Sequence, residues 1–432
     1  MSVSQDSPAR AVSAAELSTV GSLHKRHQAV LPAWVVQMHD NPISLVSGHG
    51  SHVVDSDGNE YLDFFAGIAT TVSGHGMSAV LEAIRSQSSK ILHSSTLYLI
   101  EPMVELAELL LSTTPSSHEK AFFVNSGTEA IDTALMLATN YTGSNSVISM
   151  RNAYHGRSFA AVAVTGLPGY SATALSPFNV QFAPYGDSEQ FERLVQESDS
   201  DIAAVIVEPI QGVNGFDTPP DEFIQNIRKV CDRNHIVLIS DEVQTGFGRT
   251  GEAMWGIQAA GVEADLMVMA KGLGNGLPIG AVTGSADIMD SMAGGSISTF
   301  GGNHLVTSGA LANLEFIIDN DLMGNALKQG QAIRLELESL RSEYKSIISQ
   351  VRGKGLMQAV VFANKDATAR PELAASVQAT CKDHGLLVGL GGVEWNVVRL
   401  APPLIVSAEE TQVAMRTLRT AIEKLCQTDI DQ

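Results

Sequence analysis

Three ionisable residues each follow a short apolar run that is typical of a buried strand. Glu208 follows IAAVIV, Asp241 follows IVLIS, and Lys271 follows LMVMA. In open α/β sheets the carboxyl ends of the strands form the edge where ligands bind, so these side chains are expected to meet there. A lysine in such a place is costly unless it is paired or modified, and desolvation makes it a usable amine nucleophile. Taken alone, Asp241 and Lys271 also fit a buried ion pair.

A second motif predicts a site for an anion. NSGTEA follows the run AFFV and opens a helix, and Ser126 and Glu129 fit a capping box. The backbone N–H groups of Gly127 and Thr128 would then lie at the positive end of the helix dipole, where a phosphate binds well. The motif alone also fits an ordinary capped helix. Together with a lysine and an aspartate, it meets the needs of pyridoxal phosphate, which takes a Schiff-base lysine and an acidic partner for its pyridinium nitrogen.

Further residues could complete a pocket for a planar cofactor. Tyr154, beside His155, follows the next strand, where an aromatic ring can stack. Val243 could pack under the cofactor ring, and Gln244 could reach the ring hydroxyl. Each of these residues is ordinary when taken alone. The chain has no HExxH, CxxC, GxSxG or P-loop motif, and its KGLGNG stretch precedes a strand, so neither a metal site nor a dinucleotide site is predicted.

The pattern of apolar runs places these motifs in an α/β fold. Between about residues 120 and 285 the runs AFFV, SVISM, AAVAV, IAAVIV, IVLIS, LMVMA and IGAV predict a parallel sheet covered by helices. Before them we expect a hairpin turning at Asp57-Gly58-Asn59 and helices in MSAVLEAIRSQ and EPMVELAELLLS. After them we expect a smaller α+β region with one strand in VRGKGLMQAVVFA. The expected division is a flexible lead at 1–20, a segment at 21–65 that packs with the small domain, a large domain at 66–324 and the small domain at 325–432.

Composition and charge exclude several classes of partner. Of 432 residues, 44% are hydrophobic and 17% charged, as in a soluble globular protein, and the net charge is -20. An acidic surface repels nucleic-acid phosphates and anionic membranes, and no apolar run reaches the ~18 residues that span a bilayer. Cys231, Cys381 and Cys426 are far apart, and the chain has no secretory signal. We therefore expect reduced thiols in a cytoplasmic protein.

These motifs, in this order, resemble the class III (ω-type) aminotransferases of the fold-type I pyridoxal-phosphate enzymes. SDEVQTGFGRTG, with a lysine 30 residues after its aspartate, is the most specific of them. The resemblance implies a large domain with a mostly parallel seven-stranded sheet and a smaller α+β domain. It also implies ping-pong transfer of an amino group from an amino donor to a 2-oxo acid such as pyruvate, glyoxylate or 2-oxoglutarate. The matching stretches are NSGTEA at 125–130, AYHGRS at 153–158, VEPIQGVNG at 207–215, SDEVQTGFGRTG at 240–251, MAKGLGNGLPIGAV at 269–282, STFGGN at 298–303 and VRGKGLM at 351–357.

The resemblance also implies roles for particular residues. Lys271 resembles the Schiff-base lysine and proton shuttle, and Asp241 resembles the partner of the pyridine nitrogen, supported by Glu208. Thr299 resembles a phosphate contact donated by the other subunit, which implies a homodimer or a dimer of dimers. Arg399 resembles the arginine that receives the substrate α-carboxylate. The other implied contacts are Ser126, Gly127 and Thr128 to the phosphate, Tyr154, His155, Val243 and Gln244 around the ring, and Arg157 and Ile68 toward the substrate.

Departures from the family pattern leave the substrate open. Relatives commonly have Gly-His-x-His-Pro where this chain has GHGMS at 74–78, near the substrate entrance, and 4-aminobutyrate enzymes have a glutamate where this chain has Val213. EPIQGVNG, VRGKGLM and CKDHGLLVGLGG are most similar to alanine–glyoxylate aminotransferase 2, which also handles β-amino acids. Arg157 instead resembles the arginine that grips the distal carboxylate of glutamate in 4-aminobutyrate and acetylornithine aminotransferases. An aminomutase, a racemase or a decarboxylase on the same scaffold is the alternative class.

Overall fold

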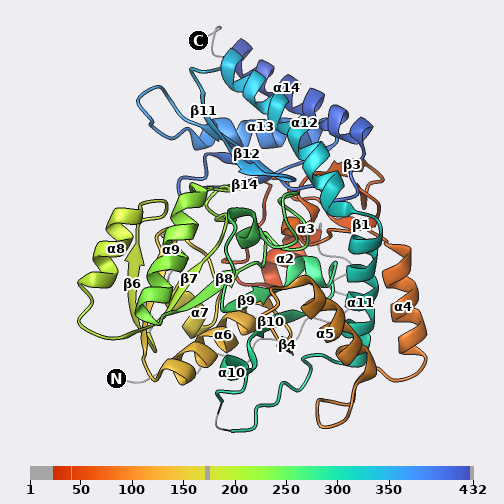
Figure 1. The fold of residues 1–432 in the computed structure, drawn as a ribbon. Coiled ribbons are helices and arrows are strands. Elements are labelled where there is room, and N and C mark those ends of the chain that lie inside the picture. Colours follow the sequence, from red (N-terminus) through yellow and green to blue (C-terminus); the bar gives the residue numbers. More distant parts are fainter. Residues whose placement is uncertain (1–22, 40, 171–175, 293, 429–432) are drawn as a thin grey trace, which may run out of the picture. The chain divides into compact units, whose positions relative to one another are not determined.

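The computed structural model describes residues 23–39, 41–170, 176–292 and 294–428 in two units. The first unit is 1–44 and contains helix α2 (Leu23–Val30). The lead expected at 1–20 lies outside the described residues. The second unit, 45–432, holds every element discussed below (Figure 1).

A seven-stranded sheet forms the centre of the second unit. Its order is β4-β10-β9-β8-β7-β5-β6, in which β5 to β9 run parallel and β10 is antiparallel to both of its neighbours. Every residue of β5 and of β8 to β10 is buried, which explains their nearly continuous apolar runs. The predicted fold class is therefore confirmed. The strands are β4 (Lys120–Val124), β5 (Ser146–Met150), β6 (Asn179–Ala183), β7 (Ile202–Val207), β8 (Val237–Asp241), β9 (Leu266–Met269) and β10 (Gly280–Gly284).

One of the predicted strands is a helix. The run AAVAV lies mostly within α7 (Phe159–Ala163), whose first turn is capped by Ser158, because the Ser158 hydroxyl accepts a hydrogen bond from the Ala161 N–H at 3.1 Å. A short apolar run does not by itself distinguish a buried strand from a buried helix, so the prediction was wrong here. The seventh strand is instead β6, a partly exposed edge strand without a continuous apolar run.

Helices cover the main sheet, and one of them begins within the NSGTEA motif. Helix α6 packs on the sheet through Ile131, Ala134 and Leu135, which share one core cluster with side chains of β7 to β10. Helix α11 packs against α4 and α5. Among the described residues, no helix combines the length and the apolar character needed to cross a membrane. The helices are α4 (Ser78–Ser88), α5 (Glu101–Thr113), α6 (Gly127–Thr142), α8 (Ser188–Gln196), α9 (Asp221–Asn234), α10 (Ala286–Met289) and α11 (His304–Asp319), with 3-10 turns η1 (Gly256–Ala260) and η2 (Lys271–Leu273).

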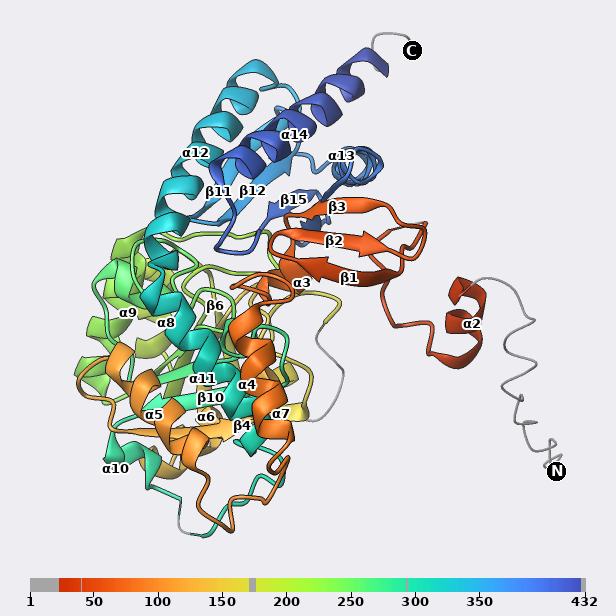
Figure 2. The ribbon, with the colours of Figure 1, turned by 90° about the vertical axis from the view of Figure 1, so that its right-hand side faces the viewer.

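Two smaller sheets accompany the main one, and one of them joins the beginning of the second unit to a strand near the end of the chain (Figure 2). The antiparallel strands β1 (Leu45–His49), β2 (His52–Asp55) and β3 (Glu60–Asp63) include the predicted hairpin, and β13 (Leu386–Leu387) pairs in parallel with β3. The other sheet has the order β11-β12-β15-β14. Its strands and helices are β11 (Ile348–Lys354), β12 (Met357–Phe362), β14 (Gly389–Gly391), β15 (Val397–Leu400), α12 (Leu322–Glu343), α13 (Pro371–Asp383) and α14 (Ala408–Thr428).

The stretch VRGKGLMQAVVFA forms two strands rather than the single strand expected. Strands β11 and β12 pair as an antiparallel hairpin, and the chain reverses around Gly355, which has φ +53°. A Cβ atom at this position would lie 2.3 Å from the Thr250 carbonyl carbon, so only glycine fits the turn. The apolar pattern alone did not reveal this reversal.

Candidate active site

A cavity of about 180 Å³ lies at the carboxyl edge of the main sheet. Strands β7, β8 and β9 end next to it, so Glu208, Asp241 and Lys271 reach the same space from three neighbouring strands. This convergence is the arrangement that the strand ends predicted. The lining residues are Ser126, Gly127, Thr128, Tyr154, His155, Gly156, Glu208, Asp241, Val243, Gln244, Ala270 and Lys271.

The amine of Lys271 is poised to act as a nucleophile. Desolvation by the surrounding protein lowers the pKa of Lys271 to about 8, although the charges of Asp241 and Glu208 act in the opposite direction. The positive charge of Arg399 lowers the pKa of Lys271 further. A larger share of the amine is therefore neutral near pH 7 than for an exposed lysine, and the neutral amine is the nucleophilic form.

Two buried carboxylates flank this amine. Asp241 Oδ2 lies 2.7 Å from His155 Nδ1, and Asp241 Oδ1 accepts a hydrogen bond from the Val243 N–H at 3.0 Å. Glu208 accepts hydrogen bonds from the backbone N–H groups of Tyr154 at 2.9 Å and Gly212 at 2.8 Å. Burial raises the pKa of Glu208 well above its ordinary value. The contact with His155 and the hydrogen bond from Val243 orient Asp241 toward the middle of the cavity, where it can face a cationic ring nitrogen.

The other end of the cavity is built for an anion. Helix α6 begins at Gly127, and one half of the predicted capping box is present: Ser126 Oγ accepts from the Glu129 N–H at 3.2 Å. The Glu129 carboxylate instead accepts from the N–H of Asn125, the residue before the cap, at 2.7 Å. The chain of Gly156 passes so close that a Cβ atom there would lie 2.5 Å from Thr128 Oγ1. The free N–H groups of the first helical turn and the tight wall around them fit a phosphate.

The wall between these two ends fits the ring of pyridoxal phosphate. His155 Nε2 and Gln244 Oε1 are both buried and have no hydrogen-bond partner within the part of the chain that the structure describes. Buried polar atoms of this kind are rare in proteins and point to a group that completes them. With an anion cradle, a carboxylate and an amine in one cavity, the residues present fit the cofactor.

A buried arginine lies near the cavity. Arg399, on β15, donates from Nε and Nη2 to the Leu390 carbonyl and from Nη1 to the Gly212 carbonyl, at 2.9, 2.6 and 2.9 Å. Its guanidinium lies 5.1 Å from the ring of Phe65 and 5.5 Å from that of Phe216. Burial lowers the pKa of Arg399 to about 10, so the side chain remains a cation at neutral pH. A buried, oriented cation of this kind is suited to bind a carboxylate.

The segment that carries Ile68 has an uncommon backbone. Ala66, Gly67, Ile68 and Ala69, which form α3 (Ala66–Ala69), all have φ between +48° and +68°. Left-handed conformations are costly for residues other than glycine, so neighbouring contacts must hold this turn. Asp63 supplies one of them, because its Oδ1 accepts hydrogen bonds from the N–H groups that enter the turn, at 2.8 and 2.9 Å.

Four of the predicted site residues do not line the cavity: Arg399, described above, and Thr299, Arg157 and Ile68. Thr299 and Arg157 are exposed, and Ile68 is 46% exposed. The backbone N–H of Arg157 does reach the cradle, because it donates to Thr128 Oγ1 at 3.3 Å. Conversely, Gly156 and Ala270 line the cavity but were not predicted as site residues. The glycine after Tyr-His was the only sequence signal for either of them.

Comparison with known proteins decides the family. The family model for class III aminotransferases matches residues 34–422. The chain belongs to the class III aminotransferases. It is therefore a pyridoxal-phosphate-dependent enzyme that transfers an amino group from an amino donor to a 2-oxo acid.

This class III aminotransferase has relatives that match over nearly their whole length. It is 37% identical to acetylornithine aminotransferase of Corynebacterium efficiens, covering 89% of this chain and 93% of the relative. It is 38% identical to the acetylornithine aminotransferase of Mycolicibacterium smegmatis, covering 90% and 97%. Among solved structures, an aminotransferase of Bacillus anthracis matches with a TM-score of 0.86 at 28% identity, covering 93% and 97%. Ornithine aminotransferase of Toxoplasma gondii, with partial occupancy of pyridoxal phosphate, matches with a TM-score of 0.83 at 26% identity, covering 96% and 95%.

Proposed function

We propose that this aminotransferase takes the terminal amino group of a donor of the acetylornithine type and passes it to 2-oxoglutarate. The observation that carries the proposal is Arg399, a buried cation near Lys271 that has no carboxylate partner among the described residues. Val213 stands where 4-aminobutyrate enzymes have a glutamate, and its side chain cannot accept a hydrogen bond, so Arg399 stays available to a substrate carboxylate. The names of the relatives that are 37–38% identical support the donor class.

The proposed division of labour follows from the positions of the side chains. When bound, pyridoxal phosphate supplies an aldehyde for the amine and a ring that serves as an electron sink. Lys271 would hold the cofactor through its amine and, once that amine is free, would move a proton as general base and acid. Asp241, oriented by its contact with His155, would face the ring nitrogen of the cofactor. Glu208 holds the backbone of Tyr154, so that the aromatic ring lies against the cofactor.

The remaining wall residues bind or orient the cofactor without entering the chemistry. Ser126, Gly127 and Thr128 hold the phosphate at the start of α6. Val243 and Tyr154 would pack against the cofactor ring, and Gln244, whose Oε1 lacks a partner among the described atoms, would be available to the ring hydroxyl. The whole set lies on sheet ends and helix starts, which keeps the cofactor orientation constant through both half-reactions.

Substitution of Arg157 by alanine is expected to reduce turnover with 2-oxoglutarate selectively. A small acceptor such as pyruvate or glyoxylate needs only Arg399, whereas 2-oxoglutarate has a second carboxylate that Arg157 would hold. Because Arg157 is exposed in this chain, solvent screens its charge, and we expect a rise in KM for 2-oxoglutarate of about tenfold. The measurement is steady-state kinetics with 2-oxoglutarate and with pyruvate in the same preparation. Equal losses with both acceptors would assign Arg157 to the donor or the architecture, and a native preference for pyruvate would favour an alanine–glyoxylate type of enzyme.

We also propose that the enzyme is a homodimer, or a dimer of dimers, with a shared active site. The described surface bears apolar side chains that a monomer would leave in water: Leu97, Tyr98, Leu99, Ile297 and Phe300 are 71%, 68%, 97%, 60% and 61% exposed. The two segments that carry them are neighbours, since the rings of His93 and Phe300 lie 5.2 Å apart. Contiguous exposed apolar surface marks an interaction site, and a second copy of the chain would cover it.

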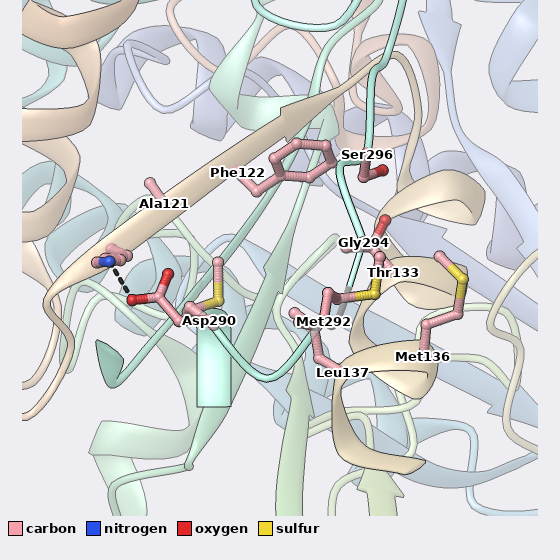
Figure 3. Close-up of a pocket in the computed structure, with 11 residues that line it drawn as sticks. Ala121, Phe122, Thr133, Met136, Leu137, Asp290, Met292, Gly294 and Ser296 are labelled. Atoms are coloured by element: carbon pink, nitrogen blue, oxygen red, sulfur yellow. Dashed lines mark hydrogen bonds and ion pairs between the residues drawn. The ribbon is translucent and has the colours of Figure 1, made fainter. Parts of the chain in front are cut away.

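The chain that leads to Thr299 also borders an apolar hollow. Gly294 and Ser296 line a pocket of about 320 Å³ together with Phe122, Met136 and Met292 (Figure 3). An ion pair between Lys120 and Asp290 closes one side. This pocket is larger than the cavity of Lys271 but brings together few titratable groups, so it supports packing of a partner subunit better than catalysis.

Mixing two inactive variants is expected to restore part of the activity. In a hybrid dimer of Lys271→Ala and Thr299→Ala subunits, one of the two sites receives both the intact lysine and the intact threonine. A random mixture places the two variants in about half of the dimers, so up to about one quarter of the native sites should recover. The assay is turnover after unfolding, mixing and refolding, with each variant refolded alone as the control. An active, cofactor-loaded monomer in sedimentation would contradict the proposal.

We also propose a division of the chain into two domains and a location in the cytoplasm. The pairing of β3 with β13 supports a small domain that combines residues 45–65 with 325–432, beside a large domain of 66–324, while the expected packing of 21–44 with it stays a prediction. Cys231 and Cys381 are free and buried, and burial raises the pKa of each thiol to about 12. Unreactive, unpaired thiols support a reducing compartment, and we propose the cytoplasm.

A further inference from the structure

A buried asparagine connects three segments around the turn of Lys271. Asn313, on α11, is fully buried, and its Nδ2 donates hydrogen bonds to the carbonyls of Gly272 at 2.7 Å and Leu273 at 3.1 Å. Its Oδ1 accepts a hydrogen bond from the hydroxyl of Ser73, also buried, at 2.7 Å. The two carbonyls fix the orientation of the amide, because only the NH₂ group can face them. The short turn η2 thus has its last two carbonyls satisfied by a side chain 40 positions away.

The backbone at Lys271 needs such support. Lys271 has φ +33°, which is uncommon for a residue with a side chain. Phe247 and Val72 also pack closely against this turn: a Cβ atom at Gly272 would lie 2.8 Å from the ring of Phe247 and 3.1 Å from Val72. Two carbonyls buried without donors would favour a different path of the chain, so the amide of Asn313 stabilises the conformation that aims Lys271 into the cavity.

A second amide ties the same turn to the loop at 73–74. Asn275 Oδ1 accepts a hydrogen bond from the Ser73 N–H at 3.0 Å, and its Nδ2 donates to the Gly74 carbonyl at 3.0 Å. Ser73 is therefore held from both sides, by Asn275 through its backbone and by Asn313 through its hydroxyl. The loop near the expected substrate entrance and the lysine turn form one hydrogen-bonded unit.

We propose that Asn313 is a positioning residue that holds the backbone of Lys271 in register with the cofactor site. The inference rests on the proposed role of Lys271 as the residue that binds the cofactor. Asn313 itself touches neither cofactor nor substrate, and it acts through the carbonyls of Gly272 and Leu273. Ser73 is the weaker member of the pair, because its loss leaves both of these carbonyl contacts in place.

The test compares Asn313→Leu and Asn313→Asp with wild-type holoenzyme. Both substitutions nearly keep the volume of the side chain but remove the two N–H donors. The pH midpoint of the absorbance of the lysine–cofactor linkage should move, and kcat should fall about ten- to a hundredfold while KM for the acceptor changes little, because the error lies in aiming the lysine. Ser73→Ala should shift the absorbance midpoint in the same direction by a smaller amount.

A matched control separates this role from a general loss of stability. Gln378, also buried, donates from Nε2 to the Val388 carbonyl at 3.1 Å and has no contact with the lysine turn among the described residues. Gln378→Leu should lower the melting temperature yet leave the absorbance midpoint unchanged. Unchanged midpoints in both Asn313 variants, or an equal shift in Gln378→Leu, would overturn the inference.

The test also covers insoluble Asn313 variants and failure of the Lys271 assignment. If both Asn313 variants prove insoluble, Ser73→Ala decides: a shifted absorbance midpoint supports the inference and an unchanged one overturns it. Wild-type enzyme must also yield Lys271 as the labelled residue after borohydride reduction and peptide mapping. Labelling of another lysine would defeat the proposed function together with the inference, whereas correct labelling with unaffected Asn313 variants would defeat the inference alone.

Discussion

Turnover should fall by about a thousandfold or more when Lys271 is replaced by alanine, because the proposed general base and acid is removed. The variant should also lose the covalent bond to pyridoxal phosphate that borohydride reduces. The reason lies in the geometry: Lys271 is the one lysine that lines the described cavity, and its lowered pKa favours the reactive neutral amine. Single-turnover absorbance measurements with an amino donor, followed by peptide mapping of the reduced protein, check both effects.

Lys354→Ala is the control for this experiment. Lys354 is also partly buried and charged, but its Nζ lies 3.1 Å from Asp221 and 3.0 Å from Glu252, away from the cavity lining. Removing it should leave the reducible bond and the chemical step intact. If Lys271→Ala still carried a borohydride-reducible cofactor, the assignment of the lysine would have to be abandoned.

Replacement of Arg399 by alanine is expected to impair turnover with every 2-oxo acid acceptor. The guanidinium is buried, oriented by the Leu390 and Gly212 carbonyls, and placed near Lys271. Without its arginine partner, binding of the substrate carboxylate is weakened by about 2–5 kcal/mol, which corresponds to a fall in kcat/KM of about thirtyfold to several thousandfold. Steady-state kinetics with pyruvate, glyoxylate and 2-oxoglutarate give the comparison.

Arg399→Lys distinguishes charge from geometry. Lysine keeps the positive charge but lacks the planar fork that binds a carboxylate through two parallel hydrogen bonds, so partial activity is expected. The cofactor absorbance should remain native in both variants, because Arg399 does not line the cofactor cavity. An acceptor that reacts at the native rate with Arg399→Ala would show that its carboxylate binds elsewhere.

Most strands of the sheet, and the ionisable residues at their ends, were predictable from the sequence because an apolar run followed by an ionisable residue marks the end of a buried strand. A fully buried strand such as β8 is almost entirely apolar up to its end, so the first ionisable residue, Asp241 at its last position, marks the sheet edge. The same reasoning did not predict edge strand β6 or helix α7 correctly. The former is only partly buried and lacks an unbroken apolar run, while the latter is apolar over a length that suits either structure.

Site residues were predictable where one short motif contains both the binding residues and the residues that orient them, as NSGTEA does. They were not predictable where the partners are distant in sequence. Nothing around Asn313 marks it, because a polar residue within a helix is ordinarily exposed, and only the fold brings it to the carbonyl of Gly272. Thr299 shows the converse case: the family pattern implies a role for it, yet it is exposed in this chain, as expected if it serves the site of another subunit as proposed.

The pairing of β3 with β13 has a consequence for how the enzyme is made. Leu62 finds its strand partner, Leu386, only after most of the chain has been synthesised. Until then the edge of β3 is unpaired, and Phe65 has not yet met Arg399. Contacts between such distant segments close slowly, and an open strand edge can pair with other chains in the meantime. During synthesis the residues that line the lysine cavity are therefore complete before the strand that carries Arg399, and we expect exposed strand edges to favour aggregation at that stage.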